Sequence, residues 1–172
     1  VRSRRQRQMC IRDSDMRRPN VAKLLNVKGD KGLSNILVGE STVDQVLIRS
    51  EYSGLDVITA GNIPPNPTEL LTSDNVSATI DALKEKYDYI FLDTPPVTIV
   101  TDAILLSKVC DGFVVVVRQT RAEKRMLTDA VSKLRFVDAK IIGFVFNGVV
   151  VSKSGYGYYK KNYKYSKYST YY

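Results

Sequence analysis

The chain has 172 residues, which suits one domain, and its apolar content of 44% is enough for a sizeable core. The net charge of +8 is concentrated at the two ends, since residues 1–14 carry +4 and residues 151–172 carry +5. The body between them is nearly neutral. The basic composition therefore does not indicate nucleic-acid binding, and no nucleic-acid partner is expected.

Missing residue types and patterns exclude several classes of protein. The sequence contains no histidine, which removes hydrolases with a Ser-His-Asp triad, Cys-His proteases and zinc sites built on histidine. The two cysteines, Cys10 and Cys110, predict no disulfide framework and fit a reducing cytoplasm. No apolar run approaches the roughly 20 residues of a membrane helix, and no signal peptide is visible, so any membrane association is expected to be indirect.

Residues 1–12 do not resemble the start of a domain. They are rich in arginine, show no apolar periodicity and predict no strand ahead of Asp13. The run Met9–Asp13 resembles the translation of a transposon-end sequencing adaptor. We therefore interpret residues 1–12 as an artefactual, non-native segment, with a native basic arm as the alternative.

Downstream of Asp13, strands and helices alternate along the chain. Helices are predicted around residues 76–83, at residues 103–109 and after residue 120. Strands are predicted at Leu55–Thr59, Tyr89–Leu92, Phe113–Val117 and Ile141–Phe146. This alternation predicts an α/β domain over residues 13–151, with a parallel sheet and helices on both of its faces.

Two of these elements carry additional signals. Phe113–Val117 is β-branched and apolar on both faces, which predicts a strand buried on both sides. Thr120 and Glu123 have the spacing of a capping box, which predicts the start of a helix. The apolar stripe of that helix is Leu127, Ala130, Val131 and Leu134.

The first motif that could carry chemistry is Asp13-Ser14-Asp15-Met16-Arg17-Arg18-Pro19. Two carboxylates two residues apart at the end of a strand point to the same side. They could order a Mg²⁺ ion and its waters, or accept a proton from a hydroxyl group. The arginines beside them suit phosphate oxygens. Taken alone, the motif is better explained as a charged turn closed by Pro19.

The second motif is Tyr89-Ile90-Phe91-Leu92-Asp93-Thr94-Pro95-Pro96. An apolar strand that delivers Asp93 to its carboxyl end is the Walker B arrangement, in which the carboxylate holds Mg²⁺, usually through water. Ligands of open parallel sheets lie beyond the carboxyl ends of the strands, so the position fits. The alternative is a strand followed by an Asx turn. Asn147, after the last strand, could pair with adenine, but a helix or turn cap explains it equally well.

Residues 152–172 form a low-complexity tail that is expected to be disordered. Five lysines lie in residues 151–172. Eight of the last 17 residues are tyrosines, namely Tyr156, Tyr158, Tyr159, Tyr163, Tyr165, Tyr168, Tyr171 and Tyr172. By itself, the tail is better explained as a basic aromatic segment that binds nucleic acid by stacking or rests on anionic lipid.

In this order, the motifs resemble those of the bacterial tyrosine kinases (BY-kinases) of capsule and exopolysaccharide synthesis. Residues 13–19 look like the Walker A′ motif of that family and residues 87–96 like its Walker B motif. Residues 32–37 and 61–71 resemble two family stretches between these motifs, and the tyrosine tail lies where the family's autophosphorylated cluster lies. The resemblance covers residues 13–172 and implies a P-loop NTPase-like fold of the deviant Walker type.

The resemblance implies a tyrosine-protein kinase that transfers the γ-phosphoryl group of ATP to the tail tyrosines in trans, within a ring of subunits. Asp13, Asp15 and Asp93 would be catalytic, with Asp13 and Asp93 also holding Mg²⁺ through water. Arg17 would contact phosphate and Asn147 adenine. The implied cofactors are ATP and Mg²⁺. The implied partners are a membrane-embedded activator or chain-length regulator of polysaccharide export and a tyrosine phosphatase, at the inner face of the cell membrane.

One departure from the family is severe. The Walker A loop, G-x-x-x-x-G-K-[ST], should precede Walker A′, but only 12 residues do so and none match. The stretch Gly29-Asp30-Lys31-Gly32 is a superficial lookalike, because it follows no predicted strand and its lysine is not followed by Ser or Thr. The chain as given is therefore expected to lack the P-loop strand and helix, and to be inactive in phosphoryl transfer.

Two rival functions belong to other classes. A partition or septum-positioning ATPase would share the deviant Walker fold, but it would end in an amphipathic helix or nothing rather than in a tyrosine cluster. A binding module would use the Lys/Tyr tail to grip nucleic acid or membrane. Neither rival accounts for the motif at residues 13–19, the motif at residues 92–96 and the tail in that order.

Overall fold

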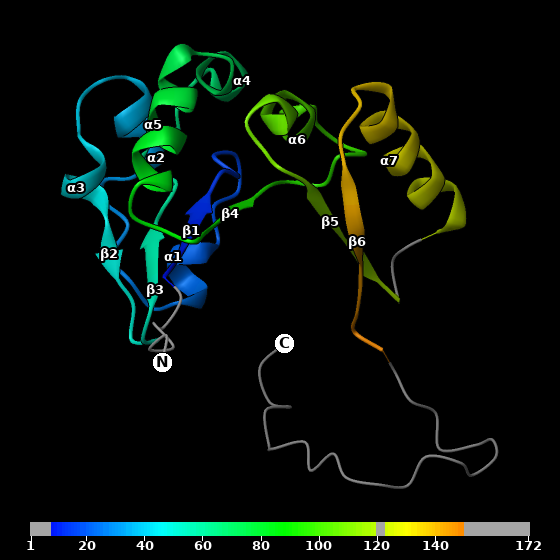
Figure 1. The fold of residues 1–172 in the computed structure, drawn as a ribbon, viewed down its shortest axis with the longest axis horizontal. Coiled ribbons are helices and arrows are strands. Elements are labelled where there is room, and N and C mark those ends of the chain that lie inside the picture. Colours follow the sequence, from blue (N-terminus) through cyan, green and yellow to red (C-terminus); the bar gives the residue numbers. More distant parts are fainter. Residues whose placement is uncertain (1–7, 120–122, 150–172) are drawn as a thin grey trace, which may run out of the picture.

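A computed structural model describes residues 8–119 and 123–149 of the chain. Its main sheet has four strands in the order β2-β3-β1-β4 (Figure 1). Strands β1 (Met9–Asp13), β3 (Leu55–Ile58) and β4 (Tyr89–Asp93) are parallel, and β2 (Ile48–Arg49) adds a short antiparallel edge. A second sheet consists of the parallel pair β5 (Phe113–Arg118) and β6 (Ile141–Asn147). The predicted α/β class with parallel strands is confirmed.

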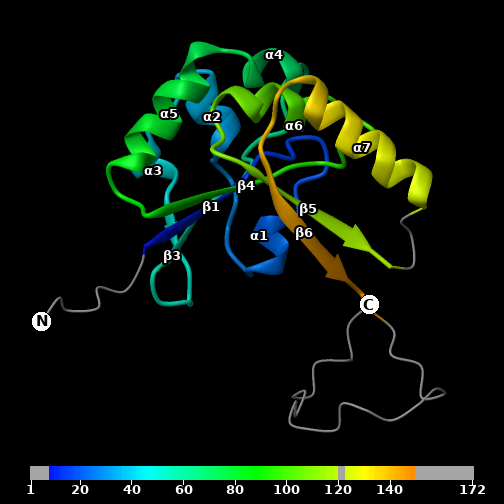
Figure 2. The ribbon, with the colours of Figure 1, turned by 45° about the vertical axis from the view of Figure 1, so that its right-hand side comes forward.

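Most helices of the described chain lie on one side of the strands. The short helices α1 (Val21–Leu24), α2 (Leu33–Leu37) and α3 (Val43–Val46) lie between β1 and β2 in the chain. They are followed by α4 (Pro67–Leu71), α5 (Asp74–Lys84), α6 (Asp102–Leu105) with the 3₁₀ turn η1 (Leu106–Lys108), and α7 (Lys124–Phe136). Figure 2 shows α2, α4, α5, α6 and α7 on one side of the strands and α1 on the other.

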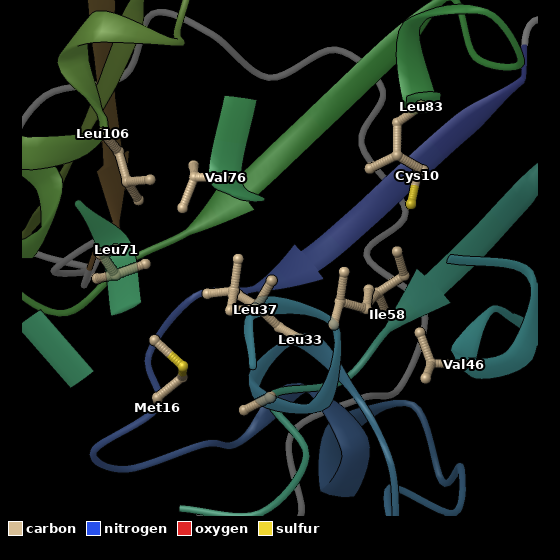
Figure 3. Close-up of a cluster of buried hydrophobic side chains, with 12 residues drawn as sticks. Cys10, Met16, Leu33, Leu37, Val46, Ile58, Leu71, Val76, Leu83 and Leu106 are labelled. Atoms are coloured by element: carbon tan, nitrogen blue, oxygen red, sulfur yellow. The ribbon is translucent and has the colours of Figure 1, made fainter. Parts of the chain in front are cut away.

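The core lies between the main sheet and the helices on its covered side (Figure 3). Cys10 and Ile58 point into it from β1 and β3, and Leu33 and Leu37 from α2. Helix α5 contributes Leu83 by the periodicity that the sequence predicted, with Val76 and Ile80 on the same buried face. Full burial of each such leucine or isoleucine contributes about 1.5–3 kcal/mol, so this layer supplies most of the stability.

The predicted strands downstream of residue 50 are all present, but the expectation that no strand precedes Asp13 is wrong. Residues 9–13 form β1, which pairs with β3 on one side and with β4 on the other. The folded part of the chain therefore extends upstream of the boundary expected at residue 13. The sequence hid this strand because Arg12 interrupts its apolar pattern.

Two expectations for the second half of the chain are also wrong. Strand β5 is not buried on both sides, because Val114 and Val116 are exposed. Helix α7 begins at Lys124 with Glu123 as its N-cap, so the predicted capping box does not start it; Thr120 lies outside the described residues. The predicted stripe is confirmed at Ala130 and Leu134, which are buried.

Several apolar side chains of β4, β5 and β6 are exposed. Strands β4 and β5 each have one edge without a neighbouring strand in the described chain, since β4 ends one sheet and β5 ends the other. We call the outward apolar side chains of β4, β5 and β6 the bare sheet face. They are Tyr89 and Phe91 of β4, Val114 and Val116 of β5, and Val145 of β6, which pairs with Val116; all are exposed. Exposed apolar side chains on a sheet are typical of a face that another segment covers.

Arg12 is the least favourable residue of the core. Its side chain is 0% exposed, and Nη1 and Nη2 have no hydrogen-bond partner in the described chain. Its Nε–H makes only a long contact of 3.5 Å with Ser14 Oγ. Burial lowers the pKa of the Arg12 guanidinium to about 10, although the thiols of Cys110 and Cys10 oppose this shift. A buried, largely unpaired cation costs free energy of folding.

Replacing Arg12 with methionine should therefore stabilise the protein. Arg12→Met removes the buried charge and keeps a similar length of apolar chain, so the free energy of unfolding should rise by about 1–4 kcal/mol. Urea denaturation followed by circular dichroism measures the change. Arg49→Met, at an exposed position of β2, is the matched control and should change the free energy by less than about 0.5 kcal/mol. A loss of stability in Arg12→Met would show that the guanidinium has a partner.

Candidate functional site

The carboxyl ends of β1 and β4 form the candidate site. The two strands pair in parallel, with Asp13 opposite Asp93, and the Ser14 N–H donates to the Asp93 carbonyl at 2.8 Å. Asp15 follows two residues after Asp13. The structure thus brings the three predicted carboxylates to one edge of the sheet, beyond the ends of parallel strands, where ligands of open α/β sheets bind.

Asp13 is buried, and both oxygens of its carboxylate accept hydrogen bonds from backbone N–H groups. Oδ1 accepts a hydrogen bond from the Asp15 N–H at 3.2 Å, and Oδ2 accepts from the N–H groups of Asn20 and Val21, both at 3.1 Å. These bonds end β1, shape the turn and start α1. Burial raises the pKa of Asp13, the nearby charge of Asp93 adds to the rise, and the hydrogen bonds from the backbone oppose it.

Asp15 and Asp93 are more accessible than Asp13. Asp15 Oδ1 accepts from the N–H groups of Arg17 and Arg18 at 3.1 and 2.9 Å, while its other oxygen accepts no hydrogen bond from the described chain. Asp93 is exposed as a residue, but its carboxylate is partly desolvated. That desolvation raises the pKa of Asp93, and the negative charge of Asp15 raises it further. A cation near these two carboxylates would favour their charged forms.

Arg17 contacts protein groups on two other elements. Its Nε–H donates to Asp102 Oδ2 at 3.0 Å, and its Nη2 donates to Asp102 Oδ1 at 3.3 Å and to Thr68 Oγ1 at 2.7 Å. The Asp102 hydrogen bond raises the pKa of Arg17. The predicted contact of Arg17 with phosphate stays a prediction. Sequence reasoning missed Asp102 and Thr68, because an acid that opens a helix and a threonine near a proline carry no signal of a distant partner.

Asn147 ends β6, which belongs to the second sheet and not to the sheet that carries Asp13 and Asp93. Its Oδ1 accepts from the Gly148 N–H at 2.7 Å, and its carbonyl accepts from the Gln119 N–H at 3.0 Å. These contacts match the turn-cap explanation of Asn147. The adenine contact is untested, and the eight tail tyrosines lie outside the described residues.

The residues present fit a magnesium ion in part. Within residues 8–119 and 123–149, no group of three or more Asp, Glu, Cys or His side chains could hold a metal ion directly. Asp15 and Asp93 together suit a Mg²⁺ ion that keeps most of its waters. A cradle for phosphate is missing from the sequence, which has no G-x-x-x-x-G-K-[ST]. The lookalike loop does not replace it, since the Gly32 N–H donates to Asn35 Oδ1 at 3.0 Å.

Comparison with known proteins identifies the family. No protein-family model matches the chain. Tyrosine-protein kinase YwqD of Bacillus subtilis is 36% identical over 154 residues, which cover 89% of this chain and 65% of that protein. The kinase domain of the Escherichia coli tyrosine kinase ETK has a similar structure, with a TM-score of 0.80 at 30% identity, over 88% of this chain and 61% of that chain. Over the part that it spans, the chain is a member of the bacterial tyrosine kinase family.

The same comparison supports the expected fold. The septum site-determining protein MinD of Pyrococcus horikoshii, solved with Mg-ADP, has a TM-score of 0.65 at 20% identity, over 81% of this chain and 57% of that chain. At this identity the likeness shows the fold alone, which is P-loop NTPase-like. This BY-kinase chain spans about two thirds of the length of YwqD. None of its described helices is both long enough and apolar enough to cross a bilayer.

The hydrogen bonds of Asp13 and Asp15 predict different costs for the same substitution. Asp13→Asn should lower the free energy of unfolding by about 1–3 kcal/mol, because an amide cannot accept at both ends from the three backbone N–H groups that bind the Asp13 carboxylate. Asp15→Asn should cost about 1 kcal/mol or less, because its carboxylate is partly exposed. Thermal and urea unfolding of both variants at pH 7 test this. Equal costs would mean that Asp13 does not organise the turn.

The raised pKa of Asp93 predicts a pH dependence. A carboxyl group whose pKa is higher in the folded state than in the unfolded state contributes stability below its unfolded value of roughly 3.9, and this is lost as pH rises through the folded value. Asp93→Asn removes that titration. The variant should therefore gain stability relative to the wild type as pH rises from 3 to 7, measured as the difference between their melting temperatures. A difference that is constant with pH would contradict the desolvation of Asp93.

Proposed function

We propose that the intact protein is an ATP-dependent tyrosine-protein kinase that transfers the γ-phosphoryl group to tyrosines of its own C-terminal tail in trans, in capsular or exopolysaccharide synthesis. The observation that carries this proposal is the pairing of Asp13 with Asp93 in adjacent parallel strands. It places two acidic strand ends together in a chain that is 36% identical to a tyrosine-protein kinase.

The carboxylates would divide the work at this site. Mg²⁺–ATP, when bound, supplies the phosphoryl group and neutralises its charge. Asp93 and the accessible oxygen of Asp15 would orient the waters around Mg²⁺ and could take the proton of an incoming tyrosine hydroxyl. Asp13, already bonded to three backbone N–H groups, would hold the turn in place and add negative charge near Asp93. In this proposal Asp13 would interact with Mg²⁺ through a water molecule and through the attraction between their charges.

The 172-residue chain alone would not perform the reaction. It has no Walker A loop, so the β- and γ-phosphates lose the backbone N–H cradle and the lysine that the family uses. The unpaired edges of β4 and β5 and the bare sheet face agree with a strand and a helix that are missing beside the site. The absent segment would complete both the sheet and the nucleotide pocket.

The proposed assembly and location follow from the family. A ring of subunits would present the tail tyrosines of one subunit to the carboxylates of the next. A membrane-embedded activator or chain-length regulator would hold the ring at the inner face of the cell membrane, and a tyrosine phosphatase would reverse the modification. Each phosphate adds about −1.5 to −2 charges at neutral pH, so a fully phosphorylated tail would change from basic to acidic and loosen the ring.

Phosphorylation of the tail tests the proposal directly. The purified chain is incubated with Mg²⁺–ATP, alone and with the kinase domain of the E. coli tyrosine kinase ETK, and phosphotyrosine is mapped by mass spectrometry. Alone, the chain should show no ATP turnover and no phosphotyrosine above the blank, because it lacks the phosphate-binding loop. With the added kinase, phosphate should appear on the tyrosines of residues 156–172.

The control is a variant with all eight tail tyrosines replaced by phenylalanine, which keeps the basic and aromatic character of the tail. It should accept no phosphate under the same conditions. ATP turnover by the unaccompanied chain would overturn the predicted inactivity. Phosphate confined to tyrosines outside the tail would overturn the acceptor role, and would favour a tail that binds lipid or nucleic acid.

A further inference from the structure

The contact between Arg17 and Asp102 differs from the other ion pairs of the described chain. The acids of the pairs with Lys84, Lys86 and Lys133 are 50–73% exposed, so these pairs contribute little. Asp102 is 0% exposed, and the Arg17 side chain that covers it is 37% exposed. A buried carboxylate depends on its partner far more than an exposed one does.

The guanidinium of Arg17 joins three segments of the chain. Two of its nitrogens bind both oxygens of Asp102, the first residue of α6, and one of them also binds Thr68 of α4. These partners lie 85 and 51 residues from Arg17 in the sequence. The planar fork of arginine suits this arrangement, and a lysine could not reproduce it.

The backbone of the same residue is bonded to the candidate site. The N–H groups of Arg17 and Arg18 donate to Asp15 Oδ1 at 3.1 and 2.9 Å. Residues 94–101 connect Asp93 to Asp102, and the Ser14 N–H binds the Asp93 carbonyl. These contacts form a closed loop. Hydrogen bonds join Asp15 to Arg17 and Arg17 to Asp102, the chain leads from Asp102 back to Asp93, and Asp93 is bonded to Ser14, next to Asp15. Such a closed loop holds the two accessible carboxylates at one separation.

We propose that Arg17 is a positioning residue, which fixes Asp15 relative to Asp93 through its contacts with Asp102 and Thr68. The biological role of this positioning rests on the function proposed above, because carboxylates at a fixed separation would orient the waters bound to Mg²⁺. Groups that orient the ligands of a metal typically change its affinity about 10–100-fold, which is the effect expected for their loss in an intact kinase. The positioning itself is a property of this chain and does not need nucleotide.

Nuclear magnetic resonance tests the positioning directly. In the ¹⁵N-labelled chain, Asp15→Asn should shift the amide proton resonances of Arg17 and Arg18, because both amides donate to Asp15 Oδ1. If Arg17 positions this turn, the shift should fall to less than about half in the Asp102→Asn background, as a double-mutant cycle reports coupling between groups. Thr68→Val keeps the shape of the side chain, and in this background the shift caused by Asp15→Asn should fall by an intermediate amount. This second variant keeps the test valid if Asp102→Asn does not fold.

The matched control is Asp44→Asn, which removes the acid of the exposed pair with Lys86 and should leave the effect of Asp15→Asn unchanged. An equal effect of Asp15→Asn in the wild-type and Thr68→Val backgrounds, with only a lower melting temperature, would overturn the proposal and leave a purely structural ion pair. None of these measurements uses ATP turnover. Failure of the positioning and failure of the kinase function are therefore distinguishable.

Discussion

Strand β1 pairs with β3 on one side and with β4 on the other, and this double pairing places Asp13 opposite Asp93. The backbone hydrogen bonds of two ladders hold the strand, so it tolerates a buried arginine as its fourth residue. The Asp13 carboxylate then accepts hydrogen bonds from three backbone N–H groups. These bonds end the strand and fix the turn that carries Asp15 at the edge of the sheet. The candidate site thus depends on backbone pairing more than on any side-chain contact.

Periodic segments of this BY-kinase chain could be predicted from the sequence, and short or interrupted ones could not. Helix α5 and strands β3 and β4 follow apolar patterns that identify them. Helices α1, α2 and α3 have only four or five residues, too few for a helical period. The exposure of β5 could not be predicted. An apolar strand indicates that both of its faces are normally buried, but the sequence does not show whether another element packs on each face.

The same division holds at the site. The two acidic motifs predicted that Asp13 and Asp93 meet, because carboxyl ends of parallel strands share one edge. The strand that delivers Asp13 was not predicted. The different surroundings of Asp13 and Asp15 could not be predicted, as both are aspartates in one motif and only the fold determines which is buried. The link from Arg17 to Asp102 spans 85 residues and leaves no pattern in the sequence. Contacts of this kind follow from topology, which a local motif does not contain.

If copies of the chain pair through the bare sheet face, the apparent stability of the protein depends on its concentration. Open strand edges and exposed aromatic side chains favour pairing with another copy, and a partner that binds only the folded state raises its apparent stability. Melting temperatures should thus increase with protein concentration, unlike those of a closed monomeric domain. Variants are comparable only at one concentration. In the cell, the same surface would attract chaperones and proteases unless another segment or a partner covers it.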